Sequence, residues 1–210
     1  MDRQSSLWTG IAVAALLWFY MFSPWTSGVS NFWLNMSISA TILCCFVIAD
    51  RPGPFRIDLN WKRIVGQFLS GCLIAFALWG VFYIGDKLSQ LMFGFARTQV
   101  DNVYGMKEGT SPVLIAVLLL VLIGPAEELF WRGYVQRTMS GKFGADKAML
   151  ITLAVYALIH IWSFNFMLVM AALVAGAVWG LLYRLKPSML PALVVSHALW
   201  DALVFIIIPI

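Results

Sequence analysis

The chain has 210 residues, of which 61% are hydrophobic and only 11% are charged, whereas soluble domains carry roughly 25% charged residues. A water-soluble globule needs a polar surface over its core, and 14 Lys and Arg with 10 Asp and Glu are too few to supply one. The composition therefore excludes a soluble protein and predicts one embedded in lipid. The net charge of +4 does not indicate nucleic-acid binding, because the basic residues lie in short loops between apolar stretches and form no single patch.

Seven apolar stretches approach the length of about 20 helical residues that a bilayer core about 30 Å thick requires. The sequence therefore predicts an all-α fold, a polytopic transmembrane helix bundle of about seven spans. We interpret the first stretch as a retained helix rather than a signal peptide, because only Arg3 precedes it as a basic residue and no small-residue cleavage site follows. The expected spans are 7–22, 32–49, 64–84, 112–138, 147–163, 165–183 and 189–208.

Lys and Arg in the loops predict how this bundle is oriented, because basic residues concentrate on the cytoplasmic side. They occur before the first span and after the second, fourth and sixth, whereas the loop 23–31 has none. This pattern places the N-terminus inside and the C-terminus outside. The segment 85–111 is too polar to span, and we expect it to lie along the outer interface as an amphipathic helix. The inside residues are Arg3; Arg51, Arg56, Lys62 and Arg63; Arg137, Lys142 and Lys147; and Arg184 and Lys186.

Apart from Arg137 and Lys147 at the span ends, six Asp, Glu, Arg and His residues fall within the predicted spans. A charge there costs several kcal/mol, so each is a candidate site residue by default. Both histidines of the chain and two of its three glutamates are among them. With one tyrosine they form three clusters on three spans within 75 residues, which indicates one shared site. The candidate residues are Glu127, Glu128 and Arg132; Tyr156 and His160; and His197 and Asp201.

The first cluster combines a paired and an unpaired carboxylate. Glu128 and Arg132 stand four residues apart on a helix and can form an ion pair, whereas Glu127 points about 100° away and gains no partner from its own helix. An unpaired carboxylate in a dry site suits a group that takes and returns a proton. Gly124 and Pro125 precede the cluster, and a proline at this place opens the helix locally. The alternative is a cytoplasmic helix cap with a weak surface ion pair.

The second and third clusters share one geometry, in which two polar residues stand four apart on one helix face. Two chemistries fit the whole set. In one, Glu127 and His160 activate a water while His197 and Asp201 stabilise a tetrahedral oxyanion, with no metal. In the other, His160, His197 and a carboxylate, Asp201 or Glu127, bind zinc with an open water position. No G-x-S-x-G, P-loop or G-x-G-x-x-G motif supports a serine enzyme or a nucleotide site.

In order and spacing, these clusters resemble the CPBP family of intramembrane proteases, which includes the Rce1-type CAAX prenyl endopeptidase and bacterial Abi-like membrane proteins. The family motifs are EExxxR, FxxxH and HxxxN. The resemblance covers roughly 112–205, and two positions depart from it. Tyr156 replaces Phe and can add a hydroxyl donor; Asp201 replaces Asn, and an ionised Asp only accepts hydrogen bonds. The matching residues are Glu127-Glu128-x-x-x-Arg132, Tyr156-x-x-x-His160 and His197-x-x-x-Asp201.

The resemblance implies cleavage of a peptide bond near the C-terminus of a membrane-associated protein or peptide. In that interpretation Glu127 is the catalytic glutamate acting with His160, Glu128 and Arg132 support it, and the third cluster lies on the oxyanion side. We expect no cofactor, with zinc as the alternative, and we expect a multi-pass protein of a bacterial inner membrane. Residues 1–111 would form N-terminal helices with the outer interfacial segment, and 112–210 the catalytic bundle.

Two other classes of function stay open at this point. One is a non-catalytic immunity or scaffold protein of the same fold, and the other is a small ion or proton transporter that uses the buried charges as a relay. Helix lengths also raise a conflict over depth. At 1.5 Å per residue, Glu127 lies about 22 Å from the outer face and His160 about 20 Å from the inner one, so tilt or a kink is needed to bring them together.

Overall fold

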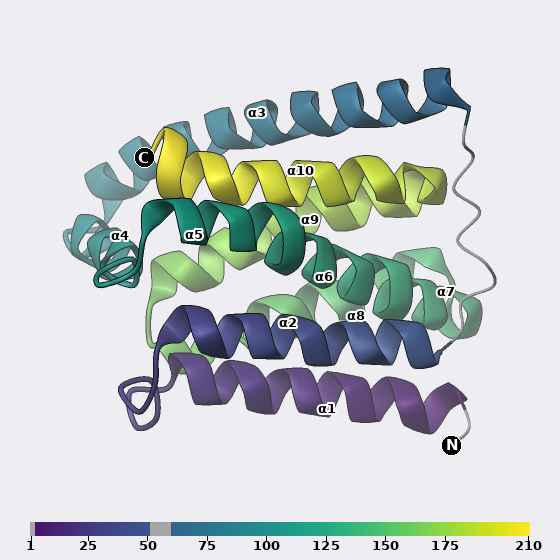
Figure 1. The fold of residues 1–210 in the computed structure, drawn as a ribbon, viewed down its shortest axis with the longest axis horizontal. Helices are drawn as coiled ribbons and strands as arrows, with labels where there is room; N and C mark the ends of the chain where they lie inside the picture. Colours follow the sequence, from purple (N-terminus) through teal and green to yellow (C-terminus); the bar gives the residue numbers. More distant parts are fainter. Residues whose placement is uncertain (1–2, 51–59) are drawn as a thin grey trace.

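The computed structural model describes residues 3–50 and 60–210. Within these ranges the regular structure is entirely helical, and most of the helices run side by side as a bundle (Figure 1). This confirms the predicted all-α membrane bundle. Two of the predicted inside charges, Arg51 and Arg56, lie outside the described residues.

Ten α-helices follow in chain order, joined in places by short π-helical and 3-10 segments. The α-helices are α1 Arg3–Phe22, α2 Phe32–Ala49, α3 Trp61–Met92, α4 Ala96–Gly105, α5 Pro112–Leu118, α6 Gly124–Glu128, α7 Arg137–Phe143, α8 Ala145–Leu158, α9 Phe166–Leu185 and α10 Leu190–Ala202. The π-helical segments are η1 Leu119–Ile123, η2 Leu129–Gln136 and η5 Leu203–Ile207, and the 3-10 segments are η3 Ile161–Ser163 and η4 Pro187–Met189. The elements from α5 to α7 therefore form one continuous helical run.

Six helical runs among the described residues are long and apolar enough to cross a bilayer, and Ser6–Phe22 of α1 is a shorter apolar helix. Together they correspond to the seven predicted spans, and the protein is an integral, multi-pass membrane protein. The two chain ends of Figure 1 lie at opposite ends of the bundle, as an odd number of crossings requires. Which end faces the cytoplasm stays a prediction from the loop charges.

Asparagine side chains define where three of the spans begin. Asn31, Asn60 and Asn165 are the residues before α2, α3 and α9, and each side-chain oxygen accepts a hydrogen bond from a backbone N–H of the first turn. Such caps satisfy N–H groups that have no partner within the helix. Because the caps precede strongly apolar stretches, the start of these spans is well determined by the sequence.

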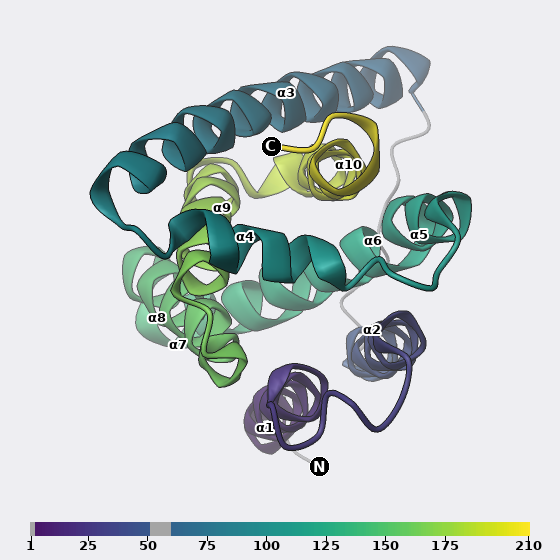
Figure 2. The ribbon, with the colours of Figure 1, turned by 90° about the vertical axis from the view of Figure 1, so that its left-hand side faces the viewer.

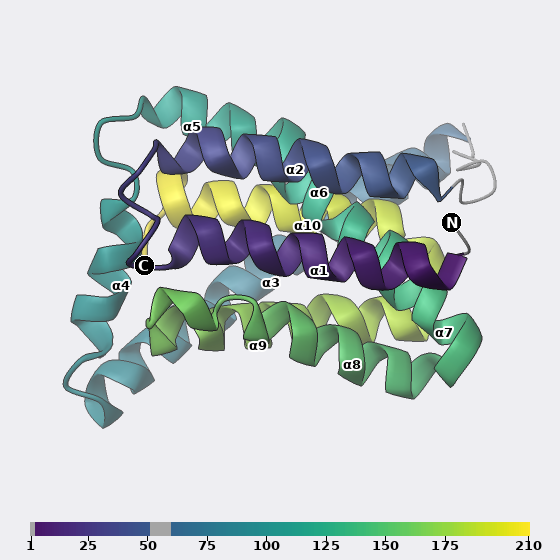
Figure 3. The same ribbon diagram turned by 90° about the horizontal axis from the view of Figure 1, so that it is seen from below.

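The segment 85–111 differs in part from its prediction. Residues 85–92 do not leave the third span but continue α3 to Met92, so α3 is 32 residues long. Only Ala96–Gly105 forms a separate helix, α4, with a strong division between polar and apolar faces. Figures 2 and 3 show α4 lying across the end of the bundle, roughly at right angles to the spans. The expected amphipathic helix is therefore present but shorter than predicted.

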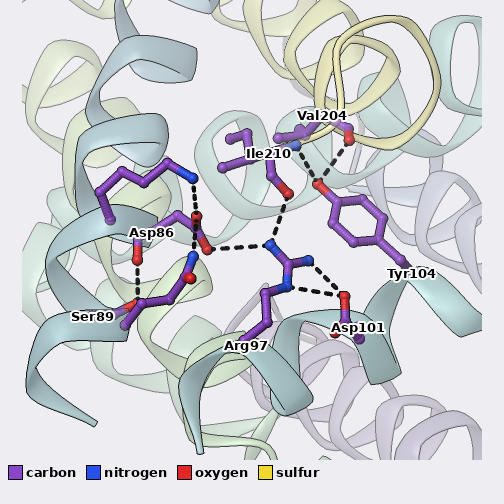
Figure 4. A network of polar contacts seen from close by, with 9 residues as sticks. Asp86, Ser89, Arg97, Asp101, Tyr104, Val204 and Ile210 are labelled. Atoms are coloured by element: carbon purple, nitrogen blue, oxygen red, sulfur yellow. Dashed lines mark hydrogen bonds and ion pairs between the residues drawn. The ribbon is translucent and has the colours of Figure 1, made fainter. Parts of the chain in front are cut away.

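Polar contacts tie α4 to its neighbours (Figure 4). Arg97 donates to Asp101 at 2.7 Å and lies 3.7 Å from the buried Asp86 carboxylate on α3. The hydrogen bond to Asp101 raises the pKa of Arg97, and burial raises the pKa of Tyr104. The Tyr104 hydroxyl donates to the Val204 carbonyl at 3.0 Å. These bonds join α4 to α3 and to the end of the last span.

Small residues allow α10 to pack closely inside the bundle. In Figure 2, α10 lies below α3, with α9 on one side and α5 and α6 on the other. A Cβ on Gly71 of α3 would lie 2.6 Å from the Ala192 carbonyl oxygen, and one on Gly124 would lie 2.6 Å from Ala198 Cα. Only glycine fits at such distances. These contacts bring the third polar cluster on α10 against the first one on α6.

Candidate active site

A partly open apolar cavity of about 590 Å³ lies between the helices, with its polar lining gathered on a few residues. Residues from α2, α3, α4, α9 and α10 supply most of its apolar wall. Five of the seven predicted site residues line it, and the other two, Glu128 and Arg132, lie fully buried behind the wall. The five are Glu127, Tyr156, His160, His197 and Asp201. The structure therefore brings the three sequence clusters together at one cavity.

The difference in depth expected between Glu127 and His160 does not keep them apart, since both line the same cavity. The run Pro112–Phe143 is 32 residues long and crosses the bundle obliquely (Figure 1), so Glu127 is not held at the depth that an upright span would give. Tyr156 lies one helical turn before His160 and reaches Glu127, with its hydroxyl donating to Glu127 Oε2 at 3.2 Å. Tyr156 thus connects the first cluster to the second.

The helix opens locally at Gly124 and Pro125, as the sequence predicts. The run is π-helical in η1, directly before these residues, and the Gly124 N–H bonds to the Leu119 carbonyl five residues back. Proline has no N–H to continue the α-helical pattern. The α-helix resumes as α6, which presents Glu127 to the cavity and Glu128 to the interior.

The predicted ion pair between Glu128 and Arg132 is present and buried. Arg132 Nη1 lies 3.1 Å from Glu128 Oε2, and the exposed fractions of the two side chains are 1% and 0%. Arg132 also donates to the Gly176 carbonyl at 3.0 Å, and its guanidinium lies over the rings of Tyr156 and Trp179. The alternative interpretation as a surface pair at a helix cap is therefore wrong, because the pair lies at the centre of the protein.

Glycine at position 176 is required for this arrangement. A Cβ there would lie 2.9 Å from Tyr156 Cδ1. The absence of that atom lets α9 pack against Tyr156 of α8 while the Gly176 carbonyl accepts from Arg132.

His197 lies between two carboxylates. Its Nδ1 donates to Glu128 Oε2 at 3.1 Å, and its Nε2 lies 3.6 Å from Asp201 Oδ2. The ring stacks on Trp179 with centroids 4.0 Å apart, and the Trp179 indole donates to the Ser196 hydroxyl. Only an imidazole protonated on both nitrogens can donate to both carboxylates. The arrangement is therefore suited to hold a donor N–H at the cavity wall.

His160 is held through both of its ring nitrogens. Helix α8 ends at Leu158, and the His160 backbone N–H bonds to Ala157 rather than to Tyr156, so the Tyr156 carbonyl is free. His160 Nδ1 lies 2.8 Å from that carbonyl, which can only accept, so Nδ1 carries the proton. The other nitrogen, Nε2, accepts from the Trp18 indole N–H at 3.0 Å.

The metal alternative finds no preformed ligand set. Among the residues that the structure describes, no group of three or more His, Cys, Asp and Glu side chains could hold a metal ion. Both nitrogens of His160 contact other protein groups, and His197 contacts Glu128 and Asp201. The candidate ligands His160, His197, Asp201 and Glu127 line one cavity without converging on one point.

Three site contacts come from residues that the motifs did not indicate. They are the indole of Trp18, the indole of Trp179 and the carbonyl of Gly176. Each lies in an apolar stretch with no motif of its own, and the two tryptophans are fully buried. The two tryptophans lie four residues inside the predicted ends of the spans 7–22 and 165–183, and the one signal they give is an indole N–H that needs an acceptor once it is buried.

The fold and site together define an integral membrane protein with a buried carboxylate and histidine centre that faces an apolar cavity. Residues 109–203 match the family described as type II CAAX prenyl endopeptidase Rce1-like. This match confirms the resemblance to the Rce1-type, CPBP family, which is a family of proteases and implies a membrane-associated protein substrate. All seven predicted site residues lie within the matched region. No curated protein and no solved structure matches the chain.

Proposed function

We propose that the protein is an intramembrane endopeptidase that hydrolyses a peptide bond near the C-terminus of a membrane-associated protein or peptide. The observation that carries the proposal is that Glu127, His160 and His197, which all lie in the Rce1-like region, line one cavity. A carboxylate and two imidazoles supply what amide hydrolysis needs, which is a proton acceptor for water and a donor for the oxyanion.

In the proposed reaction, Glu127 is the general base. It takes a proton from a water as the water oxygen bonds to the scissile carbonyl carbon, and it returns that proton to the leaving amine nitrogen as the C–N bond breaks. The Tyr156 hydroxyl holds one oxygen of Glu127 at 3.2 Å and so fixes the carboxylate. His160 lines the same cavity and is the second group able to accept a proton from the water.

The oxyanion is assigned to the other side of the site. His197 donates to it from Nε2, the nitrogen that faces Asp201, while Glu128 holds Nδ1. Arg132 balances the charge of Glu128 and fixes it against α9 through Gly176. A donor already oriented toward the developing charge is typically worth about 100-fold to 1000-fold in turnover.

The wall of the cavity indicates the nature of the substrate. Apolar side chains such as Phe82, Met92 and Val100 make up most of it, and it lies within the membrane-spanning bundle. An apolar segment or a lipid-modified residue loses little hydration on entering such a space. A soluble, polar peptide would not be accepted.

Turnover of a C-terminally tagged membrane substrate in liposomes tests the proposal. We expect Glu127→Ala and His197→Ala to reduce cleavage by at least about 100-fold and His160→Ala by at least about tenfold. Glu108→Ala is the matched control, because it removes the one glutamate outside the predicted spans. Full cleavage in all three site variants contradicts the proposal, and so does a wild-type protein that cleaves nothing.

Metal dependence is tested separately from proteolysis. We propose water activation without a metal, because the nitrogens of both histidines already contact protein groups. Cleavage should survive a strong chelator, and purified protein should contain no stoichiometric zinc. Stoichiometric zinc together with loss of cleavage on chelation would favour the zinc mechanism instead.

A further inference from the structure

The Trp18–His160 hydrogen bond joins the N-terminal helix to the site. Trp18 lies on α1, outside the matched region 109–203, and its side chain is fully buried. Its indole N–H lies 3.0 Å from His160 Nε2, with the two rings edge to face at 80°. The bond therefore occupies the one nitrogen of His160 that is free to accept a proton.

This bond and a protonated Nε2 exclude each other. Nδ1 carries a proton because it faces the Tyr156 carbonyl at 2.8 Å, so Nε2 holds the lone pair. An indole has a donor and no acceptor. If His160 took a proton from water at Nε2, two N–H groups would face each other, so the Trp18 N–H has to withdraw before the transfer.

His160 does not need Trp18 to keep its orientation. The bond from Nδ1 to Tyr156 fixes one edge of the ring, and the ring packs against Tyr156 at 5.3 Å and Phe22 at 5.6 Å between centroids. Loss of the indole donor alone would leave these contacts in place. The distinct effect of the Trp18 N–H is thus to occupy the lone pair.

Phe22 links this bond to the cavity. It lies four residues after Trp18 on the same helix, so both side chains point to the same side of α1. Phe22 lines the cavity and contacts the His160 ring, whereas Trp18 lies behind it. A substrate that fills the cavity would therefore contact the helix that carries Trp18.

We infer that Trp18 is a positioning residue that acts through His160: it blocks Nε2 in the resting protein and has to release it for His160 to accept the proton of the water. The inference rests on the proposed function for its effect on rate, but the bond itself can be observed without cleavage. It makes α1 a part of the site, although α1 carries none of the three motifs.

The kinetic test uses Trp18→Phe, which keeps a buried aromatic ring and removes the donor. We expect kcat to rise about threefold to tenfold, the size of one net hydrogen bond, with KM within about twofold of the wild type. Trp131→Phe is the matched control, because Trp131 is equally buried and its indole N–H has no hydrogen-bond partner among the described residues. A purely structural role for Trp18 predicts a fall in kcat, and an unchanged or lower kcat overturns the inference.

Nitrogen NMR of ¹⁵N-histidine-labelled protein tests the bond without substrate. The chain has two histidines, so His197→Asn assigns the spectrum. We expect His160 to carry its proton on Nδ1 in the wild type, and its Nε2 signal to shift in Trp18→Phe but not in Trp131→Phe. An Nε2–H tautomer, or an unchanged signal, overturns the inference even if the protein cleaves. If the wild type cleaves nothing, the proposed function fails while the spectrum still decides whether Trp18 blocks His160.

Discussion

Replacing Arg132 by methionine tests whether the buried ion pair holds the site together. The change keeps an unbranched apolar side chain but removes the bonds to Glu128 at 3.1 Å and to the Gly176 carbonyl at 3.0 Å. Glu128 is 0% exposed, so its charge would remain in the interior with only His197 as a partner. Removing one member of a buried pair typically costs about 3–5 kcal/mol, and we expect the free energy of unfolding to fall by that amount.

The assay is reversible unfolding in mixed micelles, followed by tryptophan fluorescence. We expect the double variant Glu128→Leu with Arg132→Met to be more stable than Arg132→Met alone, because it leaves no unpaired charge. Arg184→Met is the control, because Arg184 pairs with Asp146 at the surface. Its free energy of unfolding should equal that of the wild type within error. A loss below about 1 kcal/mol for Arg132→Met, or a double variant as unstable as the sum of the singles, would refute the reasoning.

Three further predictions concern the donor to Glu127, the packing of α10 and the anchoring of α4. Tyr156→Phe should lower kcat about threefold to tenfold with the fold intact, because it removes only the hydroxyl that holds Glu127; equal kinetics would contradict this. Gly124→Ala should lower the free energy of unfolding by about 1–3 kcal/mol and abolish most of the cleavage, because the new Cβ would lie 2.6 Å from backbone atoms. Gly80→Ala is the control: it has open space around it and should be as stable as the wild type. Arg97→Gln should speed hydrogen exchange in α4, and unchanged exchange would show that the network of Figure 4 does not anchor it.

The sequence predicted the spans and most of the residues that meet at the candidate site, because its signals were local. Apolar length set the helices, and the rarity of charge within them marked Glu127, His160 and Asp201 as site residues. The i,i+4 spacing predicted the ion pair of Glu128 and Arg132, and the structure confirms it. These features depend on residues close together in the chain, which a helical pattern alone can relate.

The remaining features depend on contacts between distant parts of the chain. Trp18 and His160 are 142 residues apart, and nothing in the spacing of an apolar helix indicates which indole meets which imidazole. The extension of α3 through 85–92 was missed because polar residues there suggested an end to the span, whereas Asp86 is buried against α4. A charge that is paired by another element does not end a helix, and a single-sequence pattern does not show that partner.

The central claim is that Glu127 and His197 act together on one reacting peptide bond. It is tested most directly by kcat for cleavage in liposomes by Glu127→Gln, His197→Asn and the double variant. Because both residues serve the same transition state, the account predicts that the double variant is no more than about threefold slower than the slower single variant. Two independent losses that multiply in the double variant, or a single variant that cleaves at the wild-type rate, would contradict it.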